Sequence, residues 1–177
     1  SMMTAYYKKD DANSLNREPV FETGSLIYAE DHVSLIGENP MIGHNEPKWG
    51  PRFYDMTDVY SIKYNAVIVE EANKVLADKK HLIPQPAKVL FHANSNFQEY
   101  SKLERTYIAE VGKLKVLATH GCREIIVARH HDQAEKAMDI CYLGLIVGDG
   151  AYSDDAINKC YSDSKQAIAQ LLTLATK

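Results

Sequence analysis

The sequence predicts an α/β fold, because short apolar segments of strand length alternate with longer segments of helical periodicity. The chain has 177 residues, of which 45% are hydrophobic and 25% are charged, as is usual for a globular domain with one core. This composition excludes a chain that is disordered throughout. The alternation is typical of a sheet in which at least some strands are parallel.

The N-terminal segment is polar and differs from the rest of the chain. We expect residues 1–15 to be loose, with Ser1 and Met2 left from an expression tag. Residues 16–177 show no repeat, low-complexity tract or obvious linker. They are therefore expected to form a single domain.

Two short strands and a long loop come next in the predicted order. Ser25–Ala29 and Val33–Ile36 are apolar enough to be strands, and the acidic pair Glu30-Asp31 separates them. The loop from Gly37 to Met56 holds three prolines and three glycines together with Trp49. Loops of this length in a compact domain usually carry function or pack on a partner.

Helices are predicted where apolar residues recur at helical spacing. The predicted helices run from Thr57 to about Lys79, from Gln98 to about Val111, from Cys122 to about His131, and onward from Ser153, which is expected to cap the last helix. The first two carry predicted apolar stripes of Ile62, Ala66, Val69, Ala72 and Leu76, and of Leu103, Tyr107 and Val111. The inner face of the last helix is predicted to hold Ile157, Tyr161, Ser164, Ile168, Leu171 and Ala175.

The loops after three further strands are the expected binding site. Strands are predicted at Lys88–Phe91, Lys115–Ala118 and Asp139–Val147. Ligands of α/β sheets bind beyond the carboxyl ends of the strands. The loops there are His92–Gln98, Thr119–Cys122 and Val147–Gly150.

Charge, hydropathy and cysteine spacing exclude several functional classes. The net charge of −4 argues against a nucleic-acid-binding protein held by phosphate contacts. We expect no membrane span, because no apolar segment approaches the roughly 18 residues that a span needs. We expect no signal peptide, because Ser1–Asp11 has no apolar core. Cys122, Cys141 and Cys160 lie far apart and form no C-x-x-C pair. We therefore expect reduced thiols, a cytoplasmic protein and no metal, and we interpret His130-His131-Asp132 as structural.

Residues 31–60 carry three motifs in one ungapped stretch. These are Asp-His-Val-Ser-Leu from residue 31, Gly-Glu-Asn-Pro-Met-Ile-Gly-His-Asn from residue 37, and Gly-Pro-Arg-Phe-Tyr-Asp-Met-Thr-Asp-Val-Tyr from residue 50. The stretch resembles the trimeric purine nucleoside phosphorylase family, whose members carry D-H-I-N-L, G-x-N-P-L-x-G-P-N and G-x-R-F-x-x-M-S-x-A-Y. Glu124–His130 resembles that family's P-E-V-I-V-A-R-H helix. The resemblance covers most of this chain and the later part of a family member.

This resemblance implies a fold and a reaction. The implied fold is α/β, a nucleoside phosphorylase-like mixed sheet with flanking helices that lacks the family's first strands. The implied reaction is the phosphorolysis of a purine nucleoside to the free base and ribose 1-phosphate, a glycosyltransferase step of purine salvage. Phosphate is then the co-substrate, and no cofactor is expected.

The resemblance also assigns the base-binding residues. Phe97 corresponds to the aromatic residue that stacks on the base, and Gln98 stands in place of the family's base-holding Glu, with Glu99 next to it. Gly148 falls at the Asn that holds the purine N7, and a protonated Asp149 beside it would donate to N7. We therefore take Gln98 and Asp149 as the catalytic candidates.

The remaining assignments concern phosphate, ribose and the neighbouring subunit. His120, beside Thr119, falls at a phosphate-contacting Ser, and Tyr161 falls near the His that touches the ribose 5′-hydroxyl. Phe53 matches a Phe that closes the nucleoside pocket of the adjacent subunit. From the residues alone, each of these has an alternative without a ligand. Phe97 is then an anchor of the core, His120 is an ordinary loop histidine, and Gly148–Gly150 form a simple turn.

Two interpretations of function stay open. The family's Gly/Ser-rich phosphate loop and Arg-x-His pair have no counterpart in the sequence, and Asp10–Ser14 stand where the family has N-A-A-G-G. The chain is then either a phosphorylase with a remodelled site, or a non-catalytic protein that binds nucleoside or assembles with a longer relative. Without the family's first strands a sheet edge would lie open, so we expect a homo-oligomer, a trimer by resemblance.

Overall fold

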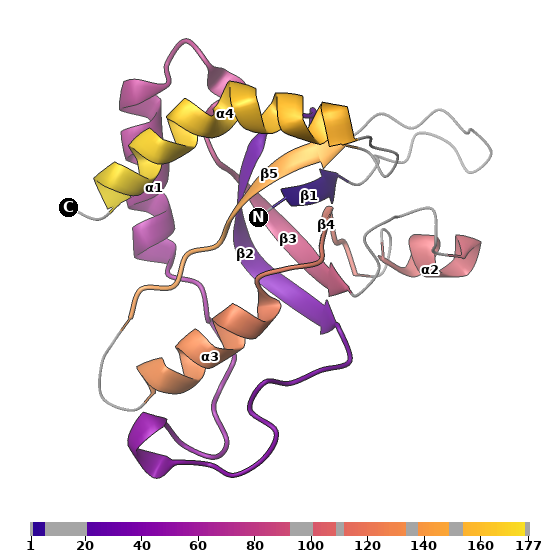
Figure 1. Ribbon diagram of the computed structural model, residues 1–177, viewed down its shortest axis with the longest axis vertical. Helices are drawn as coiled ribbons and strands as arrows, with labels where there is room; N and C mark the ends of the chain where they lie inside the picture. The colour runs from indigo at the N-terminus through magenta and orange to yellow at the C-terminus, as the bar shows by residue number, and fades with distance from the viewer. Residues whose placement is uncertain are drawn as a thin grey trace.

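The chain folds into a mixed β-sheet with flanking helices (Figure 1). The computed structural model describes residues 2–5, 21–92, 101–108, 112–133, 138–148 and 154–175. The elements in chain order are β1 (Met2–Ala5), β2 (Leu26–Leu35), the 3-10 helix η1 (Pro47–Trp49), α1 (Ile62–Val75), the 3-10 helix η2 (Lys80–Leu82), β3 (Gln85–His92), α2 (Lys102–Thr106), β4 (Val116–Ala118), α3 (Cys122–Asp132), β5 (Leu143–Gly148) and α4 (Asp154–Ala175). The predicted α/β class and mixed sheet are confirmed.

The strands close into a barrel in the order β1-β4-β3-β2-β5. Strands β2, β3 and β4 pair in parallel in that order. Strands β1 and β5 are also parallel to each other, whereas β1 pairs antiparallel with β4 and β5 pairs antiparallel with β2. The expected open edge is absent among the described strands, because β1 joins β4 to β5. Within the N-terminal segment that was expected to be loose, Met2–Ala5 form β1, and residues 6–15 lie outside the described ranges.

The two short strands predicted before the long loop are one continuous strand, β2. Ala29 lies opposite Ala87 and Asp31 lies opposite Lys88, so Glu30 is an extra residue in the ladder. Such an extra residue is a β-bulge, which bends a strand without ending it. The acidic pair therefore marks a bend in β2, not a break between two strands.

Apolar side chains on the two faces of the sheet form separate cores. One core packs under α3 and includes Ile27, Val89, Phe91, Val116, Ile125, Ile126 and Ile146. The other packs under α1 and α4 and includes Leu26, Ala72, Leu82, Leu145, Ala167 and Leu171. Neighbouring residues such as Leu145 and Ile146 enter different cores because side chains alternate along a strand. Burying each such side chain contributes about 1.5–3 kcal/mol.

Helix α1 begins later than predicted, at Ile62 instead of Thr57. Ser61 caps it, because its Oγ accepts the Tyr64 N–H at 3.1 Å. Thr57 does not begin the helix, because Asp58 after it has a positive φ of 50°, outside the helical region; the Thr57 carbonyl accepts the Arg129 guanidinium at 3.1 Å. The buried face consists of Asn65, Ile68, Ala72 and Leu76, so the predicted stripe is right only for Ala72 and Leu76.

The predicted faces of the next and last helices are partly wrong. Helix α2 is short, and Leu103 and Tyr107 are 78% and 62% exposed. In α4, Ser164 and Leu171 are buried as predicted, whereas Tyr161 is 52% exposed. Val111 and Ser153 lie outside the described residues. Spacing identifies a helix but does not determine which side of it meets the sheet.

Four aromatic rings meet inside the core under α3. The His32 ring stands edge-on to Tyr60 and to Phe91, with centroids 5.6 Å and 5.3 Å away. Phe91 in turn meets Tyr142 edge-on at 5.2 Å. The Tyr60 hydroxyl and His32 Nδ1 are hydrogen-bonded at 2.9 Å. Burial lowers the pKa of His32 below its ordinary value of 6.5, although the Asp31 carboxylate acts in the opposite direction.

We expect the free energy of unfolding to decrease as the pH falls from about 7 to about 5. The unfolded chain protonates His32 near its ordinary pKa, whereas the folded protein resists protonation until a lower pH. Stability linked to His32 is therefore present above pH 6.5 and lost as the pH falls. Urea denaturation at several pH values measures this slope. A His32→Gln variant should show a shallower slope, and an identical slope would contradict the argument.

Candidate functional site

The turn between β4 and α3 carries two of the predicted site residues, Thr119 and His120. Their side chains are hydrogen-bonded to each other, with Oγ1 and Nδ1 2.7 Å apart. Gly121 follows with φ of 109° and is the N-cap of α3. Because glycine has no side chain, the N–H groups of the first helical turn receive no side-chain cap from it. The turn thus combines an imidazole, a hydroxyl and a helix N-terminus.

The loop after β3 begins next to this turn. Phe91 pairs with Ala118 across the parallel strands β3 and β4. His92 and Thr119 are the next residues, so both loops leave the same edge of the sheet, as predicted. Phe97, Gln98 and Glu99 belong to the loop after β3 but lie outside the described residues.

Gly148 is the last residue of β5, and it lies at the opposite end of the sheet from the last residues of β3 and β4. Strand β5 runs antiparallel to β2 and therefore opposite in direction to β3 and β4. The prediction that all three loops lie at one end of the strands is wrong for β5. In a mixed sheet, strands of opposite direction have their carboxyl ends at opposite ends of the sheet. Asp149 lies outside the described residues, and Tyr161 lies on the half-exposed face of α4.

The long loop after β2 is held by the C-terminal half of α3. His130 is 3% exposed, its Nε2 lies 3.3 Å from Asn45 Oδ1, and its ring meets Tyr54 edge-on at 5.7 Å. Arg129 donates to the carbonyl of Asp55 at 2.8 Å. The structure thus supports a structural role for this histidine, and the described residues contain no group of three or more potential metal ligands.

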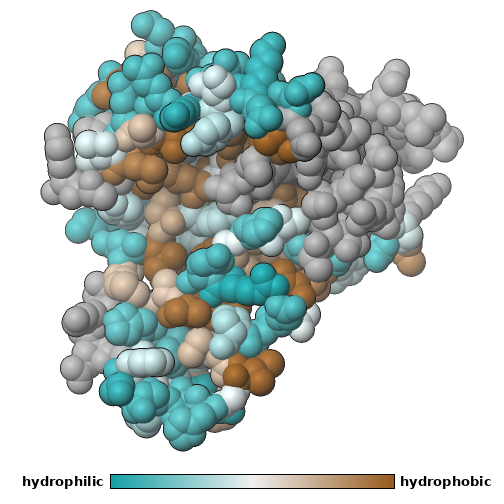
Figure 2. Space-filling view, viewed as in Figure 1, coloured by the Kyte–Doolittle hydropathy of each residue, from teal (hydrophilic) through white to brown (hydrophobic). Residues whose placement is uncertain are grey.

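The same loop exposes three large apolar side chains, which together we call the apolar loop face: Ile42, Trp49 and Phe53. They are 81%, 60% and 90% exposed, respectively. Figure 2 shows apolar side chains at the surface of the lower part of the molecule, where Figure 1 places α3 and this loop. An anchored loop with several exposed apolar side chains is typical of a protein interaction site.

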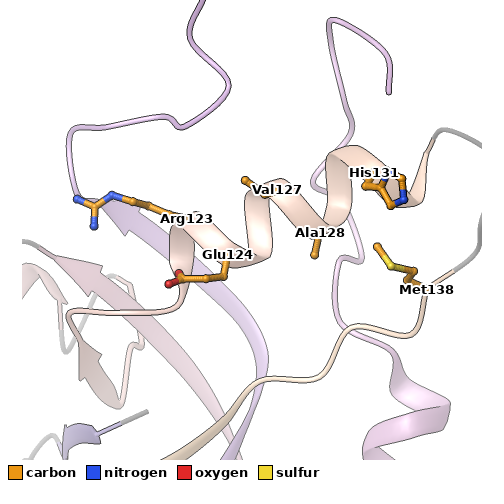
Figure 3. Close-up of a pocket in the computed structure, with 6 residues that line it drawn as sticks. All are labelled: Arg123, Glu124, Val127, Ala128, His131 and Met138. Carbon is orange, nitrogen blue, oxygen red and sulfur yellow. The ribbon is translucent and has the colours of Figure 1, made fainter. Parts of the chain in front are cut away.

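A hollow of about 520 Å³ lies on the outer face of α3 (Figure 3). It is lined by Arg123, Glu124, Val127, Ala128, His131 and Met138. None of the predicted site residues lines it, and Arg123 is already paired with Glu38, with Nε and Oε2 3.0 Å apart. The hollow is therefore separate from the turn that carries His120.

The structure gives no support to a cysteine nucleophile. Cys122, Cys141 and Cys160 are free thiols. Burial raises the pKa of Cys141 to about 11 and also raises the pKa of the other two. All three are therefore protonated at neutral pH, whereas nucleophilic cysteines react as thiolates.

Comparisons with known proteins point to one group. No model of a known protein family matches the chain. A mouse purine nucleoside phosphorylase is 31% identical over 127 residues, which are 67% of this chain and 39% of that protein. Purine nucleoside phosphorylase 1 of Bacillus subtilis is 43% identical over 49 residues, which are 28% of this chain and 17% of that protein.

A solved structure of the same group shares the fold. Purine nucleoside phosphorylase of Schistosoma mansoni in complex with inosine superposes with a TM-score of 0.71 at 15% identity. The match covers 98% of this chain and 58% of that one. The chain thus spans well under two thirds of the relatives that it matches. The described part of the chain also contains no helix long and apolar enough to cross a membrane.

We expect Gly50→Ala to destabilise the protein more than Gly43→Ala. A Cβ at Gly50 would lie 2.3 Å from the His130 carbonyl oxygen, whereas a Cβ at Gly43 meets nothing within 4 Å. Both glycines have positive φ, so both variants carry the same kind of backbone strain. The difference between their losses of stability therefore reports the close contact at Gly50. We expect Gly50→Ala to lose about 1–3 kcal/mol more, the usual cost of overpacking. Urea denaturation measures it, and equal losses would show that the loop is not held against His130.

Proposed function

Because the chain is a purine nucleoside phosphorylase-like protein, we propose that it binds purine nucleosides and phosphate at the loops after β3 and β4. The supporting observation is the register of these strands, in which Phe91 lies opposite Ala118. It brings His92 and Thr119, the residues that follow this pair, next to each other, and the proposal is that Phe97, Gln98 and Glu99, which follow His92 in the sequence, complete one site with Thr119 and His120. One loop then supplies the base-binding side chains, and the other supplies groups for phosphate.

The proposed reaction is a glycosyl transfer of purine salvage. A phosphate oxygen bonds to the anomeric carbon of ribose as the bond from that carbon to the purine nitrogen breaks, which gives ribose 1-phosphate and the base. The electron pair of the broken bond goes to the purine, so donors that stabilise the developing negative charge lower the barrier.

In this proposal each site residue has one role. The His120 imidazole and the α3 N-terminus attract the phosphate anion, with Thr119 as a further donor. Phe97 stacks on the purine, and Gln98 or Glu99 holds its edge. Asp149 is left out of this site, because Gly148 before it ends a strand that runs in the opposite direction to β3 and β4. Tyr161 contacts the ribose hydroxyl. No cofactor or metal takes part.

A second candidate function is nucleoside binding without catalysis. The favouring observation is that the interface loop keeps its motif and its anchors, whereas the base-site positions carry Gln98 and Gly148 in place of the Glu and Asn of the resembling family. Such a protein would bind nucleoside, or would assemble with a longer relative and complete its site.

The apolar loop face is the proposed contact between subunits. Phe53 is 90% exposed on a loop that Arg129 and His130 hold in place, so its side chain is available to a neighbouring copy. We propose a homo-oligomer, a trimer by resemblance, in which Phe53 closes the pocket of the adjacent subunit. The three free thiols support a cytoplasmic location.

We expect the purified protein to convert inosine and guanosine to free base in excess phosphate, as followed by absorbance. A Gln98→Ala variant should lose at least about ten-fold in rate, because it removes a contact to the leaving base, and it also reveals contaminating host enzyme. No turnover, with nucleoside still raising the melting temperature, would favour the non-catalytic function. No turnover and no thermal shift would overturn both the phosphorylase activity and the binding of nucleoside by this chain alone.

We expect Phe53→Ala to weaken nucleoside binding about ten-fold or more if its ring closes a neighbour's pocket. The melting temperature of the isolated subunit should hardly change, because the side chain is exposed. The matched control is Val67→Ala, which removes a 42% exposed apolar side chain from α1. Light scattering reports the assembly. Equal effects of the two variants on nucleoside binding would contradict the interface role.

A further inference from the structure

A buried tyrosine from a distant part of the chain is bonded to the turn that carries His120. Tyr142 lies just before β5 and is 8% exposed. Its hydroxyl donates a hydrogen bond to the backbone carbonyl of His120, with the oxygens 2.6 Å apart. The contact joins residues 22 positions apart and acts on the backbone of the turn, not on the imidazole itself.

The ring of the same tyrosine also supports the turn. A Cβ placed on Gly121 would lie 2.2 Å from Tyr142 Cε2, so the ring is packed directly against the glycine backbone. Gly121 has φ of 109°, a conformation that other residues rarely adopt. The turn is therefore held by a hydrogen bond at His120 and by ring packing at Gly121.

Tyr142 is itself held in place by the barrel. Its backbone carbonyl accepts the Ala29 N–H of β2 at 3.0 Å. Its ring meets Phe91 edge-on, and Phe91 is fully buried and lies opposite Ala118 in the β3–β4 ladder. The position of the hydroxyl is thus determined by contacts with β2 and β3, and β3 is one of the two strands that lead to the proposed site.

We propose that Tyr142 is a positioning residue, which holds the Thr119–Gly121 turn so that the His120 imidazole and the N-terminus of α3 face one phosphate anion. The inference rests on the proposed phosphate site. Without the hydroxyl, the His120 carbonyl loses the hydrogen bond that ties the turn to the barrel. The Thr119–His120 side-chain hydrogen bond would then move with the turn instead of being fixed in space.

Tyr142→Phe removes the hydroxyl and keeps the ring, and Tyr60→Phe is its matched control. Tyr60 is 5% exposed, belongs to the same group of rings, and its hydroxyl bonds to His32 away from the turn. Two readouts apply to both variants and the wild type. NMR hydrogen exchange follows the amide of Ile125, which donates to the Gly121 carbonyl at 2.9 Å, and the amide of Ile126 at the next position of the helix. Titration with inorganic phosphate follows the His120 imidazole resonance.

We expect Tyr142→Phe to speed exchange at these amides and to raise the half-saturating phosphate concentration, each by about five-fold, the usual effect of one hydrogen bond. Tyr60→Phe should change both by less than about two-fold, and the thermal shift by inosine should be the same in both variants.

Equal exchange in the two variants would overturn the inference, because the tyrosine would then only stabilise the core. A wild-type His120 that responds to phosphate, with an unchanged midpoint in Tyr142→Phe, would also overturn it while leaving the proposed function intact. If phosphate does not shift the His120 resonance in the wild-type protein, the phosphate site of the proposed function is overturned. The role of Tyr142 in positioning that site is then overturned as well.

Discussion

The parallel pairing of β2 with β3 is the interaction on which the rest of the structure depends. It runs from Ile27 opposite Gln85 to Leu35 opposite His92, and a bulge at Glu30 lets it bend. Both strands end at the same edge, so the loop that carries the apolar face and the loop that carries Phe97 begin side by side. The proposed nucleoside site and the proposed subunit contact therefore originate at one place in the fold.

Helix α3 connects these two regions. Its N-terminal turn presents His120, and its C-terminal half holds the long loop through Arg129 and His130. Because α3 is one rigid element, it sets the distance between the residues proposed to bind phosphate and the apolar loop face. This gives a physical reason for the motif that resembles the phosphorylase helix. Its histidine is buried against the loop, and this accounts for the residue without invoking a metal.

Local patterns predicted several elements close to their observed bounds. Strand β4 and helix α3 lie close to their predicted bounds, and the long loop lies where its prolines and glycines place it. The start of α1 differs from the prediction because Asp58 adopts a positive φ of 50°, in a segment whose Thr57 carbonyl is bound by Arg129, far away in sequence. Tyr142 was missed as a supporting residue, because nothing near it in sequence indicates that it reaches His120.

The sequence by itself determined the α/β class, the order of most strands and helices, and the relation to purine nucleoside phosphorylases. These follow from periodicity and from motifs within one continuous stretch. Only the tertiary structure decided that β1 closes the barrel and that β5 runs in the opposite direction to β3 and β4. It also decided that the Tyr142 hydroxyl is hydrogen-bonded to the turn at His120. Each of these joins segments far apart in the chain, and their register depends on how side chains fill the shared core, which local spacing does not encode.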